Sequence, residues 1–210
     1  YKVKCYIFSR VQTQDIEYLG NIDFSKEFVI CADGGYDFAR RLGIVPDVWL
    51  GDGDSLKSKN IEAKETIKFP PEKDNTDTDL AVELALERGF KEIVILGGIG
   101  GRIDHEFSHF CLLKKILENG AKGYLIDSRN EVTMENGPFS VYPGEKKYIS
   151  FFPFGGDVEG FSVEGLKYKA ENVTLKSDMT LAQSNCFEEG GRQAKVSFKS
   201  GFLLVIRAND

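Results

Sequence analysis

Short apolar segments alternate with helical patterns as far as about residue 130, and this alternation restricts the fold more than any other feature of the sequence. The apolar runs that predict strands are Val3–Phe8, Phe28–Cys31, Asp47–Leu50, Thr66–Phe69, Glu92–Leu96 and Gly123–Ile126. The helical patterns are Thr13–Leu19, Tyr36–Leu42, Thr78–Glu87 and Asp104–Glu118. Strands that alternate with helices form a mostly parallel sheet covered on both faces. We therefore predict an α/β domain over residues 1–132.

The composition and periodicity of the sequence change after residue 132, where glycines, aromatic residues and alternating patterns replace the long helical patterns. Strands are predicted at Tyr148–Phe152, Val158–Val163, Tyr168–Leu175, Ala194–Phe198 and Phe202–Ile206. Turn signals separate them at Pro143-Gly144, Gly155-Gly156, Gly190-Gly191 and Ser200-Gly201. Short strands with regular turns are typical of antiparallel sheets. We predict that residues 133–210 form an antiparallel β-sandwich domain.

Two acidic clusters each come shortly after an apolar run. The first contains Asp52 and Asp54, directly after Val48–Leu50, and the second contains Asp74, Asp77 and Asp79 at the start of a helical pattern. Crowded carboxylates raise the cost of ionising one another, and a hard cation such as Mg²⁺ removes that cost, usually alongside substrate phosphates. Asp and Asn are also common in turns and helix caps, which is the alternative for either cluster alone. Together the two clusters favour a magnesium-dependent site that handles phosphate.

Three candidate site positions directly follow predicted strands. They are Asp33, Asp52 and Gly97, and in a parallel sheet the ligands bind beyond the carboxyl ends of the strands. We therefore expect these positions to lie along one rim. Asp33 is either a ligand of a metal or nucleotide, or the cap of the helix that begins near Tyr36.

A glycine-rich loop runs from Gly97 to Gly101 and opens the last helical pattern of the first domain. Glycines let backbone N–H groups approach a phosphate, and a helix N-terminus adds partial positive charge. Ile103 occupies the third glycine position of a dinucleotide fingerprint, and no Gly-Lys pair of a Walker A motif occurs. Arg102 could bind a phosphoryl oxygen, and Asp104 could cap the helix or join the acidic cluster. A glycine-rich turn capped by Asp104 is the alternative.

His105-Glu106-Phe107-Ser108-His109 matches the HExxH pattern of zinc peptidases. The two histidines would share one helical face and could both bind zinc. They are the only histidines in the chain, so a third ligand would have to be a distant residue such as Glu131. A zinc-dependent hydrolase is therefore a minor alternative, since it leaves the acidic clusters and the glycine loop without a role.

Charge and cysteine content narrow the function classes. The formal net charge of −6 argues against binding to nucleic acid or to an anionic membrane surface. No apolar run is long enough to cross a membrane and no secretory signal pattern opens the chain, so we expect a cytoplasmic location. Cys5, Cys31, Cys111 and Cys186 lie far apart, and the first two fall in strand-like runs. Buried, reduced thiols are expected there rather than a disulfide framework.

Six motifs, taken in order, resemble the thiamine pyrophosphokinase family, and they extend over nearly the whole chain. They are ADGG at Ala32–Gly35, PDVWLGDGDS at Pro46–Ser55, KDNTDTDLA at Lys73–Ala81, GGIGGRIDH at Gly97–His105, GLKY at Gly165–Tyr168, and Ser184-Asn185. The resemblance implies an α/β domain followed by a β-sandwich. It also implies Mg²⁺-dependent transfer of pyrophosphate from ATP to thiamine, giving thiamine diphosphate and AMP. Members of the family are homodimers with the thiamine site between subunits.

The resemblance also implies roles for individual residues. Asp52, Asp54 and Asp77 would bind magnesium, and with Arg102 and Asp104 they would form the catalytic set. Thiamine would contact Ser184 and Asn185. Nucleotide contacts are implied for Asp33, Gly34, Asp74, Thr76, Gly98, Arg102, His105, Asp127 and Asn130. Three positions depart from the family pattern, namely Gly53 between the two acids, His109 where bacterial members often have Asn, and Cys186 where an acidic residue is common.

Three other functions remain open at the level of the sequence. A kinase of another small alcohol on the same scaffold would release ADP rather than AMP. A zinc-dependent hydrolase would contain zinc and act without ATP. A nucleotide or vitamin sensor would bind its ligand without releasing AMP.

Overall fold

The computed structural model describes residues 3–10, 15–54, 56, 60–70, 72 and 74–210. The chain divides into two compact units, Tyr1–Ser128 and Arg129–Asp210, each with its own hydrophobic core. The sequence places the change of domain between residues 132 and 133, inside strand β7 (Asn130–Glu135). Ser55 and Lys73, which belong to the motifs quoted above, lie outside the described residues.

Six parallel strands form the sheet of the N-terminal unit, in the order β4-β3-β2-β1-β5-β6. Their bounds are β1 Cys5–Phe8, β2 Phe28–Ala32, β3 Val48–Gly51, β4 Glu65–Lys68, β5 Glu92–Leu96 and β6 Lys122–Ile126. β1, β2, β3 and β5 are almost entirely buried, which explains why these strands have continuous apolar runs rather than alternating patterns. All six strands predicted for this unit are confirmed, with ends that shift by no more than two residues.

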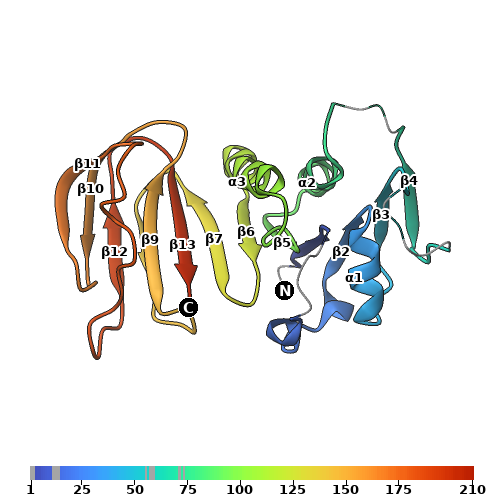
Figure 1. Ribbon diagram of the computed structural model, residues 1–210, viewed down its shortest axis with the longest axis horizontal. Helices are drawn as coiled ribbons and strands as arrows, with labels where there is room; N and C mark the ends of the chain where they lie inside the picture. Colours follow the sequence, from blue (N-terminus) through green and yellow to red (C-terminus); the bar gives the residue numbers. More distant parts are fainter. Residues whose placement is uncertain (1–2, 11–14, 55, 57–59, 71, 73) are drawn as a thin grey trace. The chain divides into compact units, whose positions relative to one another are not determined.

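Helices lie on both faces of this sheet (Figure 1). α1 (Gly35–Arg41) packs on one face, where Phe38 and Ala39 join a core cluster with Phe8 and Trp49. α2 (Asp77–Glu87) and α3 (Ile103–Glu118) lie next to each other on the opposite side in Figure 1. Successive strand residues point to opposite faces, so both faces of a buried strand need apolar partners. The predicted parallel sheet with two covered faces is confirmed.

The helix predicted at Thr13–Leu19 is wrong for the part that the structure describes. Thr13 and Gln14 lie outside the described residues, and the remainder forms only the short 3₁₀ turn η1 (Glu17–Leu19). The residue before this turn, Ile16, supplies no side-chain cap, and Gly20 ends the turn. A second 3₁₀ turn, η2 (Phe24–Lys26), leads into β2. The described part of the predicted helix, residues 15–19, is short, and a short segment rarely repays the cost of nucleating an α-helix.

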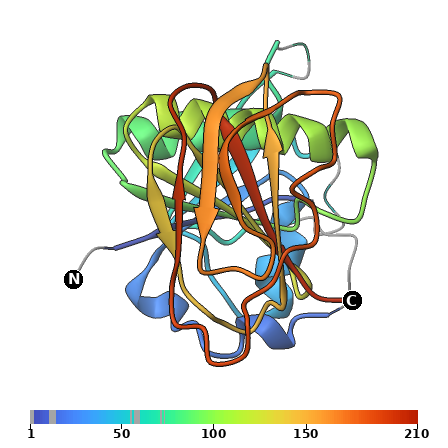
Figure 2. The ribbon, with the colours of Figure 1, turned by 90° about the vertical axis from the view of Figure 1, so that its left-hand side faces the viewer.

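The C-terminal unit is an antiparallel sandwich with one core between two groups of strands. Three strands pair in the order β7-β13-β9, and four pair in the order β11-β10-β12-β8. Besides β7, their bounds are β8 Phe139–Val141, β9 Tyr148–Pro153, β10 Val158–Glu164, β11 Ala170–Leu175, β12 Ala194–Ser197 and β13 Leu203–Ala208. Figure 2 looks at this unit from the side of β10 and β11. Phe151 of β9 and Phe161 of β10 are buried, and their rings lie 5.4 Å apart within the core.

The predicted sandwich is confirmed, but two of its strands were not predicted. β7 contains polar Asn130, Glu131 and Thr133, and β8 has only three residues. Both are defined by their partners, because β7 pairs along its whole length with β13 and β8 pairs with β12. A weakly patterned or very short segment becomes a strand when a neighbouring strand supplies the pairing.

Two cysteines are shielded and two are accessible. Cys5 and Cys31 are buried in β1 and β2, as predicted, and burial raises the pKa of both thiols. Cys111 is exposed on α3 and Cys186 is half-buried. In the described part of the chain, every helix is too short or too polar to reach across a lipid bilayer.

Candidate active site

Three aspartates meet at the carboxyl ends of β2 and β3. Asp33 directly follows β2, and Asp52 directly follows β3, with Asp54 two residues further on. Carboxylate oxygens from these residues lie within 4.8 Å of one another. Because β2 and β3 are neighbouring parallel strands, their ends lie at the same edge of the sheet. We call Asp33, Asp52 and Asp54 the acidic triad.

The acidic triad suits a hard divalent cation. Asp33 is buried, Asp52 is half-buried and Asp54 is exposed, so the group opens from the sheet toward solvent. Carboxylates this close repel one another when charged, and the repulsion grows where water is excluded. Oxygen ligands from carboxylates, completed by water and phosphate, are the usual surroundings of Mg²⁺. The residues present therefore fit the predicted magnesium ion.

Hydrogen bonds to the backbone of Asp33 and Asp54 hold the acidic triad in place. The Asp33 N–H donates to the Leu50 carbonyl at 2.7 Å, which ties the end of β2 to β3. Trp49 is fully buried, and its Nε1–H donates to the Asp33 carbonyl at 3.2 Å. The Asp54 N–H donates to Asp52 Oδ1 at 3.0 Å and so orders the acidic loop locally. Asp33 has φ of 41°, a conformation unusual for a residue with a side chain, so these contacts hold it in a strained position.

Two glycines of the motifs are required by close approaches of the backbone. A Cβ on Gly51 would lie 2.9 Å from the Cβ of Asp33, so any side chain there would push the triad apart. A Cβ on Gly35 would lie only 1.9 Å from the Phe8 carbonyl oxygen. α1 begins at Gly35, one residue earlier than predicted, with Gly34 at its N-cap. The second glycine of the ADGG motif thus allows α1 to start directly against the end of β1.

The second acidic cluster lies at the start of α2. Thr76 is the N-cap, and its side-chain oxygen accepts a hydrogen bond from the Asp79 N–H at 3.2 Å. Asp77, the first residue of the helix, is half-buried, and Asp74 is exposed. Among the described residues, the carboxylate group that could hold a metal includes Asp33 and does not include Asp77. Asp77 as a magnesium ligand therefore stays a prediction, while Asp33 joins Asp52 and Asp54.

The predicted phosphate-binding arginine is paired with its neighbour. Arg102 Nη2 donates to Asp104 Oδ2 at 2.5 Å and Arg102 Nε donates to Asp104 Oδ1 at 3.1 Å, and both side chains are exposed. The hydrogen bonds from Arg102 lower the pKa of Asp104, and those to Asp104 raise the pKa of Arg102. Arg102 is also the N-cap residue of α3, without a side-chain cap. An incoming phosphate would have to compete with Asp104 for the guanidinium.

The HExxH residues brace the glycine-rich loop. Glu106 Oε1 accepts hydrogen bonds from the N–H groups of Gly100 and Gly101, both at 2.8 Å. Buried His109 has its Nδ1 2.9 Å from the Gly98 carbonyl, and the tautomer with a proton on Nδ1 donates to it. Glu106 and His109 therefore already have partners in the glycine-rich loop. This gives the two residues a structural role, which is an alternative to zinc binding. The sequence gives no sign of this arrangement apart from the spacing of the residues along one helix.

A small pocket of about 80 Å³ opens between the loop and α3. Gly98 and His105, both predicted to contact nucleotide, line it together with Arg102, Glu106 and His109. Ser9 and Arg10, which follow β1, also line the pocket. β1 is the neighbour of β5, the strand that leads into the glycine-rich loop. The pocket therefore lies along the same rim of the sheet as the end of β1.

Stability should depend on pH through His109. Desolvation lowers its pKa below the usual value of 6.5, so the folded protein binds this proton less readily than the unfolded chain. Above the unfolded pKa, both states hold neutral His109 and its contribution is complete. As the pH falls below that value the unfolded chain gains the proton first, so the free energy of unfolding decreases, by at most about 1.4 kcal/mol per pH unit for one proton.

The His109→Asn variant is therefore expected to lose part of this pH dependence. Chemical unfolding of the wild type and the variant between pH 7 and pH 5 would measure it, with His105→Asn as the control because His105 is exposed. Equal slopes for the wild type and His109→Asn would contradict the assignment.

The remaining predicted nucleotide residues lie at strand ends. Asp127 directly follows β6, and its charge contributes, after burial, to raising the pKa of Tyr18 to about 12. Asn130 begins β7 and pairs with Ala208 of β13. Neither position is shown to bind a ligand, and both stay predictions.

Ser184 and Asn185 lie beside a pocket of the C-terminal unit. Asn185 is buried, and its Oδ1 accepts from the Tyr168 N–H at 3.0 Å while its Nδ2 donates to the Tyr168 carbonyl at 2.7 Å. Asn185 thus connects the Ser184-Asn185 motif with the GLKY motif, a link that the sequence does not reveal. Ser184 is exposed and has φ of 57°. Asn185, Tyr168 and Leu181 help to line a pocket of about 440 Å³, within the usual size range of small-molecule sites.

The fold and the site define a two-unit protein with a parallel α/β unit, an acidic rim suited to a cation and a phosphate, and a C-terminal β-sandwich. Two family models match this chain in that order. The model described as "Thiamin pyrophosphokinase, catalytic domain" matches residues 21–125, and "Thiamin pyrophosphokinase, vitamin B1 binding domain" matches residues 138–203. The chain belongs to the thiamin pyrophosphokinase family.

Individual relatives agree with the family models. The thiamine pyrophosphokinase of Bacillus subtilis (strain 168) is 37% identical over 175 residues, which cover 80% of this chain and 81% of the relative. Thiamin pyrophosphokinase 1 of Caenorhabditis elegans is 30% identical over 173 residues, covering 76% of this chain and 71% of the relative.

Solved structures agree as well. A crystal structure of thiamine pyrophosphokinase from Bacillus subtilis superimposes with a TM-score of 0.88 at 29% identity, and 100% of each chain is covered. A thiamin pyrophosphokinase from Geobacillus thermodenitrificans gives a TM-score of 0.86 at 25% identity, covering 99% of this chain and 98% of that chain. The resemblance inferred from the six sequence motifs is confirmed.

Proposed function

We propose that this protein transfers a pyrophosphoryl group from ATP to thiamine. The observation that carries the proposal is the acidic triad, Asp33, Asp52 and Asp54, at the rim of the parallel sheet in a chain of this family. The hydroxyl oxygen of thiamine forms a bond to the β-phosphorus of ATP, and the bond between that phosphorus and the oxygen bridging to the α-phosphorus breaks. AMP leaves with the bridging oxygen, and the hydroxyl proton passes to a base. The products are thiamine diphosphate and AMP.

The acidic triad would hold Mg²⁺, with Asp77 as a further candidate ligand. A magnesium ion held by these carboxylates would supply positive charge to offset that of the phosphates, which is the main requirement of phosphoryl transfer. Asp77, half-buried at the start of α2, is the candidate to orient the thiamine hydroxyl and accept its proton. Arg102, released from Asp104, would bind a phosphoryl oxygen with its two N–H donors.

Most nucleotide contacts are assigned to residues at strand ends and loops of the N-terminal unit. Asp33, Gly34 and Gly98 contribute from strand ends and the glycine-rich loop, and His105 lines the small pocket. Because Glu106 accepts hydrogen bonds from the N–H groups of Gly100 and Gly101, the phosphate contacts at this loop are assigned to Gly98, Arg102 and His105. The other members of the proposed set are Asp74, Thr76, Asp127 and Asn130.

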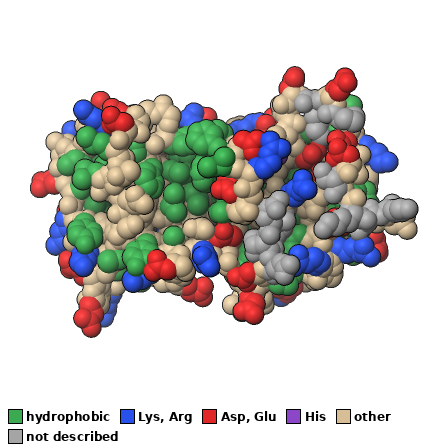
Figure 3. Space-filling model, in the orientation of Figure 1, with side chains coloured by type: hydrophobic (Ala, Val, Ile, Leu, Met, Phe, Trp, Pro, Cys, Tyr) green, Lys and Arg blue, Asp and Glu red, His purple; other side chains and the backbone are tan. Residues whose placement is uncertain are grey.

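The thiamine contacts are assigned to the C-terminal unit. Exposed Ser184 offers a hydroxyl, whereas Asn185 holds Tyr168 in place beside the pocket of about 440 Å³. Apolar side chains gather on the visible face of this unit in Figure 3. Tyr142, Tyr168, Met179 and Leu181 are large exposed apolar residues of the unit, which supports the homodimer expected from the family. A cytoplasmic location belongs to the same proposal.

Incubation with thiamine, ATP and Mg²⁺ tests the proposal, with chromatography of the products. We expect AMP and thiamine diphosphate in equal amounts, and no product when EDTA replaces Mg²⁺. Release of ADP would indicate a kinase of another alcohol instead. Hydrolysis without ATP together with bound zinc would indicate the HExxH alternative, and nucleotide binding without AMP would indicate a sensor.

A further inference from the structure

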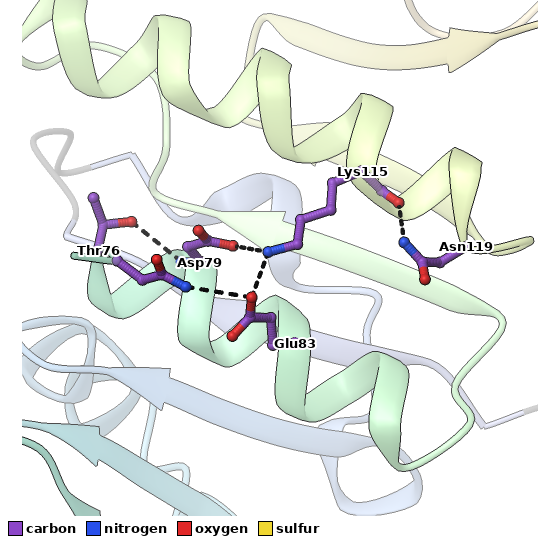
Figure 4. A network of polar contacts seen from close by, with 6 residues as sticks. Thr76, Asp79, Glu83, Lys115 and Asn119 are labelled. Atoms are coloured by element: carbon purple, nitrogen blue, oxygen red, sulfur yellow. Dashed lines mark hydrogen bonds and ion pairs between the residues drawn. The ribbon is translucent and has the colours of Figure 1, made fainter. Parts of the chain in front are cut away.

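A lysine on α3 contacts the opening turns of α2, where the second acidic cluster lies (Figure 4). Lys115 Nζ donates to Asp79 Oδ1 and to Glu83 Oε1, both at 2.6 Å. Glu83 Oε1 also accepts from Asn75 Nδ2 at 3.3 Å, so the network continues into the loop before the helix. The contacts join residues more than 30 positions apart in the sequence, with separations of 36 for Asp79 and 32 for Glu83.

Lys115 offsets a repulsion that the sequence of α2 creates. Asp79 and Glu83 are four residues apart, so their carboxylates lie on the same helical face and repel each other. Lys115 places one positive charge between them. Desolvation lowers the pKa of the lysine, but the hydrogen bonds to both carboxylates outweigh it and raise the pKa overall. Without this charge the carboxylates would separate, and Glu83 would no longer be held in its contact with Asn75.

Each of the residues next to Asp77, from Asn75 to Thr78, is held by a side-chain hydrogen bond. Asn75 is held through Glu83, and Thr76 caps the helix through the Asp79 N–H. On the buried side, Thr78 Oγ1 lies 2.9 Å from Ser9 Oγ at the end of β1. The backbone around Asp77 is therefore tied both to the sheet and to α3, and Lys115 provides the connection to α3.

We propose that Lys115 is a positioning residue that holds the start of α2, and with it Asp77, in the geometry needed for pyrophosphoryl transfer. The inference rests on the function proposed above, in which Asp77 binds magnesium and orients the thiamine hydroxyl. Lys115 itself contacts acidic side chains of α2 and acts only through them. Removal of partners that orient a metal ligand lowers metal affinity or activity by about 10- to 100-fold in other enzymes.

The exposure of the Lys115 ion pairs distinguishes a positioning role from a purely stabilising one. The side chains of Lys115, Asp79 and Glu83 are 34%, 23% and 38% exposed, and ion pairs this accessible contribute little to stability. Loss of Lys115 should therefore change catalysis much more than thermal stability. Lys114 is the matched control, because it is the preceding residue on α3 and pairs with Glu118 at 2.8 Å, on the same helix.

The test compares Lys115→Met, Lys115→Arg and Lys114→Met with the wild type. The kcat for AMP release and the KM for thiamine are measured as Mg²⁺ is varied, together with the melting temperature. A second readout follows the fluorescence of Trp49, the only tryptophan of the chain, as Mg²⁺ is added in the presence of ATP. Trp49 contacts the backbone of Asp33, so its emission should report cation binding at the acidic triad.

We expect Lys115→Met to lower kcat about 10- to 100-fold and to raise the half-saturating Mg²⁺ concentration about 10-fold, with an unchanged KM for thiamine. Lys115→Arg should restore most of kcat, since arginine keeps the charge and offers several donors. Adding Glu83→Gln to Lys115→Met should restore part of it, because the amide removes the repulsion and still accepts from Asn75. Lys114→Met should behave like the wild type.

Two results would overturn the proposal. One is wild-type kcat and Mg²⁺ dependence in Lys115→Met. The other is a loss of activity that merely follows a lower melting temperature and disappears on cooling. If the wild type releases no AMP, the proposed function is wrong, independently of the role of Lys115. The Mg²⁺ titration followed by Trp49 fluorescence then shows whether Lys115 is needed for cation binding.

Discussion

Asp52→Asn is expected to lower kcat about 10²- to 10³-fold, which is the loss seen when one group that stabilises a transition state is removed from other enzymes. Asp52 is the half-buried member of the acidic triad and lies between buried Asp33 and exposed Asp54. The amide keeps the size of the side chain but removes the negative charge that attracts Mg²⁺. The measurement is the rate of AMP release at saturating ATP and thiamine over a range of Mg²⁺ concentrations.

The loss of activity in this variant should not come from a loss of stability. Removing one of three crowded carboxylates reduces their repulsion, so the melting temperature without Mg²⁺ should not fall. The increase in melting temperature on adding Mg²⁺ and ATP should become smaller, because a ligand that binds more weakly stabilises the folded state less at the same concentration. Asp23→Asn is the control, since Asp23 is an exposed residue before the start of β2, at the other end of the strand from Asp33. Undiminished turnover of Asp52→Asn would contradict the role of the acidic triad.

Trp49→Ala is expected to reduce the free energy of unfolding by about 3–5 kcal/mol, the range for a buried aromatic residue replaced by alanine. Trp49 is fully buried in β3 and packs in the core cluster that includes Phe8 and Phe38. The substitution leaves a cavity and also removes the hydrogen bond to the Asp33 carbonyl. Trp49→Phe, which fills more of the space, should cost less.

Urea unfolding followed by circular dichroism measures this effect, because both variants lack the only tryptophan. Val45→Ala is a suitable control, since Val45 is 49% exposed and surface substitutions usually change stability by no more than about 0.5 kcal/mol. A loss below about 1 kcal/mol for Trp49→Ala would mean that the core beneath the acidic triad tolerates a cavity.

The strands of the N-terminal unit were predictable because burial on both faces leaves continuous apolar runs. β1, β2, β3 and β5 have this character, and even exposed β4 was indicated by its sequence. The order of the strands is a different matter, since it depends on contacts between segments far apart in the chain. The strand-end positions of Asp33 and Asp52 predicted a common rim, but only the pairing of β2 with β3 shows that Asp33 joins Asp52 and Asp54 in one carboxylate group.

The roles of individual side chains could also not be predicted from the sequence. The spacing of His105 and His109 allowed a zinc site as a minor alternative, but the side chains of Glu106 and His109 contact the backbone of the glycine-rich loop. The choice depends on where the loop lies relative to α3, which no local pattern encodes. In the same way, Asn185 was predicted as a thiamine contact, and only the structure shows that it binds the backbone of Tyr168.

The unequal exposure of the four thiols determines where electrophiles can modify the chain. Cys5 and Cys31 are enclosed in the central strands, and their raised pKa keeps them in the unreactive protonated form. A maleimide dye would therefore reach Cys111 on α3, and replacing half-buried Cys186 by serine would leave a single labelling position. Such a dye would lie in the same unit as Trp49, a natural donor for resonance energy transfer. The protein thus carries an intrinsic donor, Trp49, and one attachment point, Cys111, for following motion of α3 relative to the catalytic rim.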